Sequence, residues 1–437
     1  MSTTKNKGEE KKKRRLPLLA KLIIGIGAGI IIGSTGKIFK ISDTAGFVGT
    51  IRVISTLVNL FGEFLSFIIP LLIVSFVAVG LAELGKKANK LFGITLILAY
   101  TSTVIAGFTA YFLGSSLLPG MIKNITGSAA GETSFDPIFD IEMTPVFSVM
   151  TALILAFVLG LSMANIKAEA LMNIMQDLRK IVILVLEKII IPLIPFYIAG
   201  TFAKIAAGGQ LGSTIAMFAK LYICIICMQW IYILFQFTVA SIWRRENRWK
   251  DLKKIMPAYF TALGTQSSAA TIPVSLKSAE DNGIASDIRN FVIPLCATIH
   301  LAGDTICLVL GSIGIMLAFG IHPTIGIFAP FIFMLGITMV AAPGVPGGGV
   351  MAALGIIKSM LGFTEPMSEL IIALHLSQDS FGTACNITGD QSVAAIVEYI
   401  ESRSLKDSCP DDDETAYEEA GNQQNPDDHS VTYEEDN

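Results

Sequence analysis

Long apolar runs dominate this chain and recur from Leu16 to Ile400. A helix needs roughly 20 apolar residues to cross the hydrocarbon core of a bilayer. The chain is 52% hydrophobic and 16% charged, and its mean hydropathy of +0.63 is unlike that of a soluble domain. We therefore expect an all-α membrane protein, with spans near residues 16–38, 52–82, 91–117, 144–166, 178–205 and 211–241.

Basic residues collect in loops that fall on one side of these predicted spans. Residues 1–15 are basic, and further lysines and arginines occur near 86–90, 167–180 and 244–254. Cytoplasmic loops of membrane proteins carry such an excess, so we expect both termini in the cytoplasm and the protein in the inner or plasma membrane. Residues 404–437 are mostly polar and acidic, which predicts a disordered cytoplasmic tail.

Two segments in the last third are too polar and too rich in small residues for a helix that faces lipid. One reads GTQSSAATIP at residues 264–273, and the other reads AAPGVPGGG at residues 341–349. Non-helical backbone at membrane depth is tolerated only where protein buries it or where it lines a wet cavity. Each segment is therefore predicted to form the tip of a re-entrant hairpin.

Each predicted tip is followed by an apolar helix that contains a polar break, at residues 298–305 and 379–390 respectively. The unit of a hairpin and a broken helix thus occurs twice. Secondary transporters built from inverted repeats bring broken helices together near the bilayer midplane, where substrate and coupling ion bind. The sequence predicts this arrangement here.

Four polar residues near the C-terminal end of the apolar region share one helix face. Asp379, Thr383, Asn386 and Asp390 are spaced i, i+4, i+7 and i+11, which places them along roughly 16 Å of helix at about 1.5 Å per residue. A carboxylate at the centre of a membrane costs at least roughly 2.5 kcal/mol, so it marks a functional site by default. The alternative is that Asp390 lies near the cytoplasmic interface and is merely solvated.

The two tips and the motif DSFGTACNITGD at residues 379–390 resemble the signatures of the dicarboxylate/amino acid:cation symporter family, which includes the glutamate transporter homologues. The resemblance covers most of the chain in its span pattern and is most specific between residues 255 and 400. It implies eight transmembrane helices, two re-entrant hairpins, a homotrimer and an elevator motion. It divides the chain into a basic tail (1–15), six transmembrane helices (16–254), a transport core with hairpin 1, helix 7, hairpin 2 and helix 8 (255–403), and an acidic tail (404–437).

The same resemblance implies roles for single residues. Asp379 would bind the α-ammonium of an amino acid, and Asn386 with the backbone at Ser267 and Ser268 would bind its α-carboxylate. A carboxylate is the natural partner of an ammonium group, and N–H donors suit a carboxylate. The segment from Val345 to Gly349 would form the outer gate. The other candidate substrate residues are Gln266, Leu301, Asp304, Gly382 and Thr383.

The coupling ion implied by the resemblance is sodium, which prefers hard oxygen ligands. The candidate ligands are Asp390, Asn386, His300 and Thr298. In the glutamate-carrying branch the seventh helix reads Asn-Met-Asp-Gly, whereas this chain has His300 in place of the asparagine and Ala302 in place of the acid. Asp304 can compensate for the missing acid as an ion ligand, or the pair of His300 and Asp304 can carry a proton. Alternatively, His300 can simply hydrogen-bond inside the bundle. Sodium coupling and proton coupling therefore both stay open.

Departures from the acid-carrying branch decide the expected substrate. Those members usually have an arginine where this chain has Gly382, and often another where it has Gln266. That arginine at the position of Gly382 binds the side-chain carboxylate of the substrate in a bidentate fashion. Without it an acidic side chain would face Asp379 with no compensating cation. We therefore expect a small neutral amino acid such as serine, threonine or alanine, and the motif around Asn386 is similar to the serine/threonine:sodium symporter branch.

Acidic substrates, namely glutamate, aspartate or C4-dicarboxylates, are the alternative within the family. An ion channel also uses re-entrant loops, but the sequence contains no filter-like repeat. The spans contain no HExxH, GxSxG or other nucleophile and base motif, so we expect a transporter and not an enzyme. The expected partners are the amino acid, membrane lipid and further copies of this chain in a homotrimer, without nucleic acid.

Overall fold

The computed structural model describes residues 18–86, 90–122, 135–166, 168–244, 248–342 and 346–408, and its regular elements there are all helices. The first half of the chain forms α1 (Leu18–Ile38), α2 (Ala45–Lys86), α3 (Lys90–Ile122), α4 (Val149–Ile166), α5 (Glu169–Val185), the π-helix η1 (Leu186–Ile190), α6 (Ile191–Ala207) and α7 (Leu211–Arg244). The second half forms the 3-10 helix η2 (Arg248–Lys250), α8 (Asp251–Thr265), α9 (Ser268–Asp281), α10 (Ser286–Ile299), α11 (Ala302–Ala318), α12 (Ile325–Val340), α13 (Gly348–Leu361) and α14 (Glu365–Ser408).

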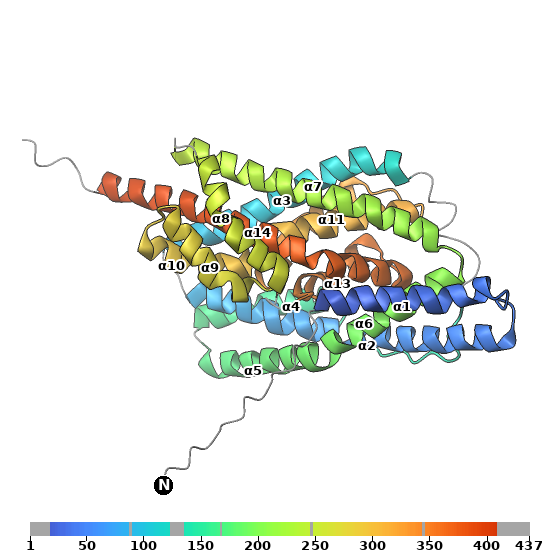
Figure 1. Cartoon of the computed structure of the whole chain (residues 1–437). Coiled ribbons are helices and arrows are strands. Elements are labelled where there is room, and N and C mark those ends of the chain that lie inside the picture. The colour runs from blue at the N-terminus through green and yellow to red at the C-terminus, as the bar shows by residue number, and fades with distance from the viewer. Residues whose placement is uncertain are drawn as a thin grey trace, which may run out of the picture.

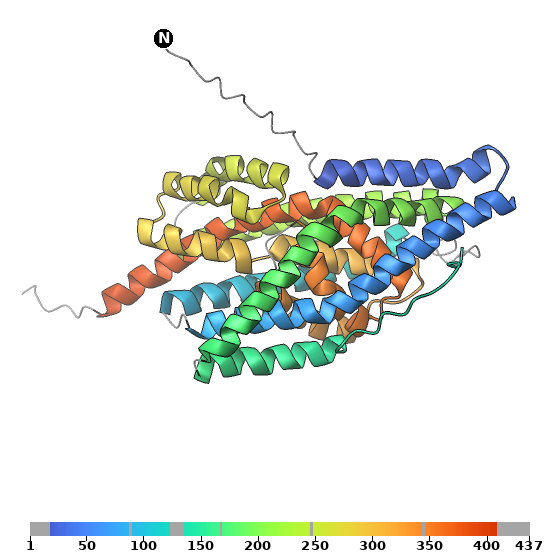
Figure 2. The same ribbon diagram turned by 90° about the horizontal axis from the view of Figure 1, so that it is seen from below.

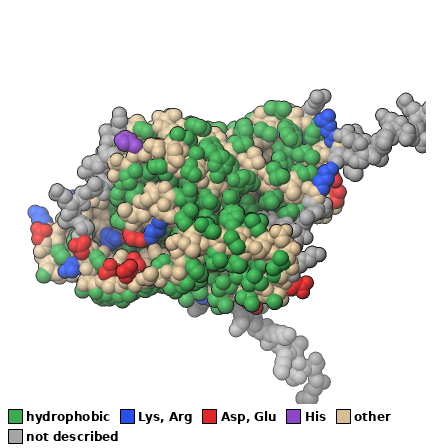
Figure 3. All heavy atoms as spheres, turned by 180° about the vertical axis from the view of Figure 1, so that it is seen from behind, with side chains coloured by type: hydrophobic (Ala, Val, Ile, Leu, Met, Phe, Trp, Pro, Cys, Tyr) green, Lys and Arg blue, Asp and Glu red, His purple; other side chains and the backbone are tan. Residues whose placement is uncertain are grey.

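All six predicted spans coincide with long helices, which confirms the prediction of an all-α membrane protein. Within the described ranges, seven helical stretches are long and apolar enough to cross a bilayer: α1, α2, α3, α4, α5 with α6, α7, and α10 with α11. The eighth predicted span, α14, is not among them, because polar residues interrupt its apolar sequence. Figure 3 shows the outcome on one face, where hydrophobic side chains cover the middle and charged side chains gather toward the two ends.

The helices pack in two groups that meet along α13 and α14. In one group, α1 packs on α6, and α2 packs on α4, α5 and α6. In the other group, α14 packs against α7, α8, α10 and α11, and α3 packs on α11. Figure 1 shows α14 running through the middle of the molecule, and Figure 2 shows α4 and α5 at one edge, away from α8, α9 and α10.

A π-helical turn joins α5 to α6 where two prolines follow closely. Pro192 and Pro195 lie in the first turns of α6, and η1 directly precedes them. Proline has no N–H to donate and its ring crowds the carbonyl of the preceding turn, and a single π turn is a common way to absorb such a mismatch within a long helix. The polypeptide therefore stays helical from Glu169 to Ala207.

The first predicted tip is a tight turn between α8 and α9, which pack together as a helical hairpin. Gln266 adopts a left-handed conformation with φ of 53° and ends α8. Ser267 then caps α9, because its hydroxyl accepts a hydrogen bond from the N–H of Ala270 at 3.3 Å. Only these two residues of the predicted segment are non-helical, and the hairpin begins at Asp251 instead of near residue 255.

The second predicted tip lies between α12 and α13, which form the other helical hairpin. Gly347 precedes α13 with φ of +76°, a conformation that glycine adopts without strain. Val345, which we predicted to belong to the outer gate, lies outside the described residues.

The two helices that follow the hairpins differ from each other. The predicted break in the first is confirmed, since α10 ends at Ile299, α11 begins at Ala302, and His300 and Leu301 have non-helical backbone. The predicted break in the second is wrong, because α14 is one continuous helix through residues 379–390. Its polar side chains bond to neighbouring helices and leave the backbone ladder intact. Residues 404–408 continue α14, and the tails at 1–17 and 409–437 lie outside the described residues.

Candidate functional site

The polar face of α14 is buried, as its helical spacing predicted. Asp379 and Thr383 are each 6% exposed, Asn386 is 1% exposed and Asp390 is 0% exposed. The alternative of a solvated Asp390 is therefore wrong. Because α14 is unbroken, one rigid element carries all four side chains and fixes their separation along the helix.

Three titratable side chains meet around Asp379, and we call them the acidic cluster: Asp304, His375 and Asp379. Asp304 lies in the first turn of α11, just after the break, and His375 lies one turn before Asp379 on α14. Their nearest oxygen and nitrogen atoms all lie within 4.8 Å of one another, and the His375 Nε2 is 2.9 Å from Asp304 Oδ1. His375 thus bridges α14 and α11, while its Nδ1 is buried without a hydrogen-bond partner.

Asn386 ties the acidic cluster to the broken helix. Its side-chain N–H donates to Asp304 Oδ2 at 2.6 Å, and its Oδ1 accepts from the N–H of Gly303 at 2.7 Å. Both oxygens of Asp304 are therefore engaged, one by Asn386 and one by His375. The non-helical backbone at Leu301 makes this possible, because it lets the first turn of α11 approach α14.

Glycines line the acidic cluster from two elements. The N–H of Gly347, at the tip of the second hairpin, donates to Asp379 Oδ2 at 3.0 Å. A β-carbon added at Gly349 would lie 3.0 Å from Asp304 Oδ1, and one added at Gly382 would lie 3.6 Å from the same oxygen. The start of α13 thus approaches Asp304 closely because Gly349 carries no side chain, whereas a β-carbon at Gly382 would make an ordinary van der Waals contact.

The tip of the first hairpin contacts α14 at Ser380, the residue that follows Asp379. The side-chain N–H of Gln266 donates to the Ser380 hydroxyl at 3.0 Å, directly beside Asp379. Ser267 uses its hydroxyl to cap α9, and Ser268 is buried at the first position of that helix. The start of α9 thus lies two residues beyond Gln266, and a helix N-terminus of this kind suits an anion such as a carboxylate.

A second buried group surrounds Asp390, and we call it the histidine network: His300, Asp390, Ser102, Tyr232 and Gln236. The His300 Nδ1 is 2.9 Å from Asp390 Oδ1, and its Nε2 is 3.0 Å from the Ser102 hydroxyl and 3.3 Å from the Gln236 amide nitrogen. The Tyr232 hydroxyl donates to the Ser102 carbonyl at 2.5 Å. Of the alternatives for His300, the pairing with Asp304 is wrong and hydrogen bonding inside the bundle is what the structure shows, because the break after Ile299 turns the two side chains to different partners.

The four predicted sodium ligands are not gathered in one place. His300 and Asp390 are in contact, and Asp390 Oδ2 is buried without a hydrogen-bond partner. Asn386 is committed to Asp304 and Gly303. Thr298 is exposed, its hydroxyl donates to the Leu295 carbonyl of its own helix at 2.8 Å, and it lines a separate cavity of about 140 Å³ with Glu83 and Arg179. Thr298 therefore does not belong to the Asp390 group.

Sequence reasoning missed the partners that α3 and α7 supply. Ser102 and Tyr232 belong to the histidine network, and Gln229 donates to the Gly303 carbonyl at 3.1 Å. A signal was present, because Gln229 and Gln236 are seven residues apart within an apolar span and so share one helix face. Buried amides in a membrane helix mark a side that packs on other polar groups.

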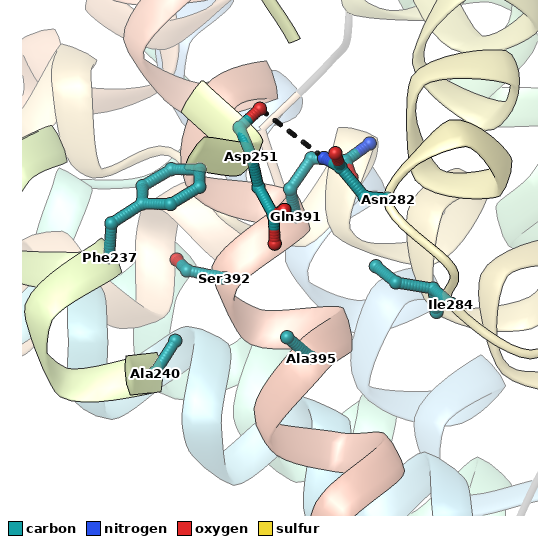
Figure 4. A pocket seen from close by; sticks show the side chains of 8 residues that line it. All are labelled: Phe237, Ala240, Asp251, Asn282, Ile284, Gln391, Ser392 and Ala395. Carbon is teal, nitrogen blue, oxygen red and sulfur yellow. Dashed lines mark hydrogen bonds between the residues drawn. The ribbon is translucent and has the colours of Figure 1, made fainter. Parts of the chain in front are cut away.

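A small cavity lined by both polar and apolar side chains lies near the Asp390 end of the α14 face, at the base of the first hairpin (Figure 4). Its volume of about 10 Å³ is close to the space that one water molecule requires. Asn282 donates from its side chain to the Asp251 carbonyl at 3.5 Å, which links the two ends of the hairpin, and Gln391 donates to the Ser275 carbonyl at 2.8 Å. These contacts fasten the hairpin to α14, so we assign them a structural role.

Comparison with known proteins identifies the family of the chain. The sequence model of the sodium:dicarboxylate symporter family matches residues 18–400, a range that includes the acidic cluster and the histidine network. The chain belongs to this family. The sodium:dicarboxylate symporters are elevator-type membrane transporters and not enzymes, which confirms the predicted family and fold class.

Individual relatives include proteins named for acidic and for neutral substrates. Excitatory amino acid transporter 1 of Mus musculus is 32% identical over 222 residues, which are 49% of this chain and 39% of that protein. Neutral amino acid transporter B(0) of Mus musculus is 28% identical over 175 residues, 40% of this chain and 32% of that protein. Neutral amino acid transporter A of Bos taurus is 27% identical over 169 residues, 38% of this chain and 32% of that protein. The matched segments cover well under half of each relative.

Proposed function

We propose that this chain is a cation-coupled symporter of a small neutral L-amino acid such as serine, threonine or alanine. The observation that carries this proposal is the pair of buried carboxylates, Asp304 and Asp379, in the acidic cluster. None of the lysine or arginine side chains whose placement is described is buried. An acidic side chain would therefore meet like charge in the pocket, while an ammonium group would be attracted there.

The α-ammonium group is proposed to bind Asp379, and the α-carboxylate is proposed to bind the start of α9. The Gln266–Ser380 hydrogen bond supports this arrangement, because it holds the tip of the first hairpin beside Asp379. Asn386 retains a second side-chain N–H after its bond to Asp304, and this N–H is available to the carboxylate. Thr383 lies one turn from Asp379 on the same face of α14.

The second hairpin is proposed to be the gate over this pocket. Its Gly347 N–H already contacts Asp379, the group that we assign to the substrate ammonium. Gate and substrate therefore share one carboxylate, so closure of the hairpin depends on what Asp379 holds. Glycine at positions 347 and 349 suits a segment that must move and yet approach the site closely.

Sodium is proposed as the coupling ion, in line with the family, and Asp390 is its proposed anchor. The support is Asp390 Oδ2, a buried carboxylate oxygen without a hydrogen-bond partner. His300 holds the other oxygen of Asp390, so it orients the carboxylate and is not itself a ligand. The contact of His300 with Asp390 also favours a second candidate, a proton, which uptake driven by a proton gradient without sodium would reveal.

A cytoplasmic location of both termini, assembly into a homotrimer and the division into scaffold and transport core are proposed together. The cytoplasmic location rests on the basic loops, which all fall on one side of the predicted spans. The homotrimer rests on the family resemblance. The division agrees with the two packing groups, since α1, α2, α4, α5 and α6 pack mainly on one another and contact the hairpin of α12 and α13 less extensively. Cysteine labelling of each terminus from one side of the membrane tests the orientation.

Uptake into proteoliposomes tests the proposed function. The purified protein is reconstituted, an inward sodium gradient is applied, and labelled serine, threonine, alanine, aspartate and succinate are offered in turn. We expect saturable, sodium-dependent uptake of serine, threonine and alanine, with little aspartate or succinate. Strong succinate or aspartate uptake without serine uptake would contradict the proposal, and ohmic current without substrate would indicate a channel.

A further inference from the structure

We infer that Asp304 and position 382 together determine substrate selectivity. Asp304 favours a substrate side chain that ends in a hydrogen-bond donor, and it would pair with any arginine placed at position 382 and neutralise its charge. This inference rests on the proposed function and adds a substrate class to it. A hydroxyl-bearing amino acid such as serine is then preferred over alanine. Acceptance of an acidic substrate then requires changes at both positions.

Asp304 lies beside Asp379, the group that we assign to the substrate ammonium. Its carboxylate and that of Asp379 lie within 4.8 Å of each other. A hydrogen bond to a carboxylate is about 2.8 Å long, so a molecule with two donors on neighbouring carbon atoms can reach both groups. Serine is such a molecule, because its ammonium and its hydroxyl are on adjacent carbons. Alanine has the first donor only.

Asp304 has acceptor capacity left for such a donor. An ionised carboxylate has about four lone-pair sites. His375 uses one at Oδ1, and Asn386 uses one at Oδ2. These two bonds fix the orientation of the carboxylate and leave the other sites for the substrate. Gly349 and Gly382 leave Oδ1 unshielded, since β-carbons there would lie 3.0 Å and 3.6 Å from it.

Position 382 is in direct contact with Asp304. A β-carbon built on Gly382 would lie 3.6 Å from Asp304 Oδ1 and 3.7 Å from its Cγ. An arginine introduced here therefore starts beside a buried carboxylate, and a guanidinium pairs with a carboxylate in a bidentate fashion. Its charge would be consumed by Asp304 and would not be available to an acidic substrate. Gly382→Arg alone is thus not sufficient to create a carrier of aspartate.

The test compares four proteins in the same proteoliposome assay: wild type, Asp304→Asn, Gly382→Arg and the double variant. The Asn replacement keeps the shape of Asp304, and Asp287→Asn, an exposed acid at the start of α10, serves as the matched control. Size-exclusion chromatography verifies that each variant is folded. The readouts are the KM values for serine and alanine and the rate of aspartate uptake.

We expect wild type and Asp287→Asn to prefer serine over alanine, and Asp304→Asn to lower that preference about tenfold, because the substrate hydroxyl loses its charged acceptor. Gly382→Arg alone should show no aspartate uptake above wild type, whereas the double variant should transport aspartate at least about tenfold faster than either single variant.

An unchanged ratio of serine to alanine in Asp304→Asn would overturn the inference. Equal aspartate uptake by Gly382→Arg and by the double variant would overturn it as well. Failure of the proposed function looks different, because wild type itself would then transport neither serine nor alanine.

Discussion

The acidic cluster and the histidine network lie on the same face of α14, yet they differ in what encloses them. The acidic cluster is covered by the glycine tip at Gly347 and Gly349, which belongs to a hairpin. The histidine network is enclosed by its own side chains Tyr232 and Gln236, which belong to α7, a long continuous helix.

This difference separates the two proposed tasks of the protein. Glycine backbone can withdraw and return, so the acidic cluster is suited to a substrate that must enter and leave. Bulky partners on long helices can only shift together, so the histidine network is suited to a small ion that needs little room. Even Gly389 is packed tightly there, because a β-carbon would lie 2.6 Å from Gln236 Oε1 and 2.8 Å from His300 Cε1.

The largest expected effect comes from Asp379→Asn in the acidic cluster. This change removes the charge that we assign to the substrate ammonium and barely alters the volume. Loss of one member of a buried charge pair costs roughly 2–5 kcal/mol, so uptake of serine should fall about a hundredfold. Labelled uptake measures the loss, and size-exclusion chromatography checks the fold. Serine uptake at the wild-type rate would remove Asp379 from the binding site.

His300→Ala probes the histidine network and should have the next largest effect. It removes the donor that orients Asp390 Oδ1, and loss of such an orienting partner typically weakens ion binding 10–100-fold. The sodium concentration for half-maximal uptake should rise by about that factor, with the serine KM at saturating sodium little changed. His322→Ala, at an exposed histidine, is the control. A sodium dependence identical to that of the control would exclude this role.

Gly349→Ala tests whether the glycine tip must approach the acidic cluster. The added methyl would lie 3.0 Å from Asp304 Oδ1 and 3.5 Å from His375 Nε2. Overpacking of this kind costs about 1–3 kcal/mol, so the rate of serine uptake should fall about tenfold. Gly326→Ala on the same hairpin is the matched control, since a β-carbon there meets nothing within 4 Å. Equal rates for both variants would argue against a gate that closes on Asp304.

Glu83→Gln lies outside both groups and should have the smallest effect. Glu83 and Arg179 are partly exposed and 3.6 Å apart, and such pairs contribute about 0–1 kcal/mol. Thermal unfolding of the purified protein should shift by only a few degrees, with serine uptake unchanged. A tenfold loss of uptake would instead assign a transport role to the cavity that these side chains line.

Local sequence patterns predicted the spans and the helix faces, because periodicity and composition act over short distances. The spacing of Asp379, Thr383, Asn386 and Asp390 predicted their common face, and the small residues at 264–273 and 341–349 predicted the two tips. Periodicity did not reveal that α14 would stay unbroken, since polar residues do not end a helix when neighbouring helices accept their bonds.

The pairing of the buried groups was beyond sequence reasoning, because it depends on contacts between distant segments. His300 bonds to Ser102 across 198 positions of the chain and to Asp390 across 90. Asp304 and His375 are 71 positions apart. The break at His300 and Leu301 separates the directions of the two side chains, so that Asp304 contacts His375 and His300 contacts Asp390. Spacing alone offered His300 with Asp304 as one possible pair, because the two are four residues apart in the sequence, and it gave no sign of the contact between His300 and Asp390.

The most direct test of the account measures binding of matched ligands to the purified wild-type protein by isothermal titration calorimetry in sodium buffer. L-serine is compared with N-acetylserine and with glycerate, both of which lack the ammonium group but retain the carboxylate and the hydroxyl. If Asp379 binds the ammonium in a buried acidic cluster, serine binds and the two analogues bind at least about a hundredfold more weakly. Binding of glycerate as tight as that of serine would contradict the account.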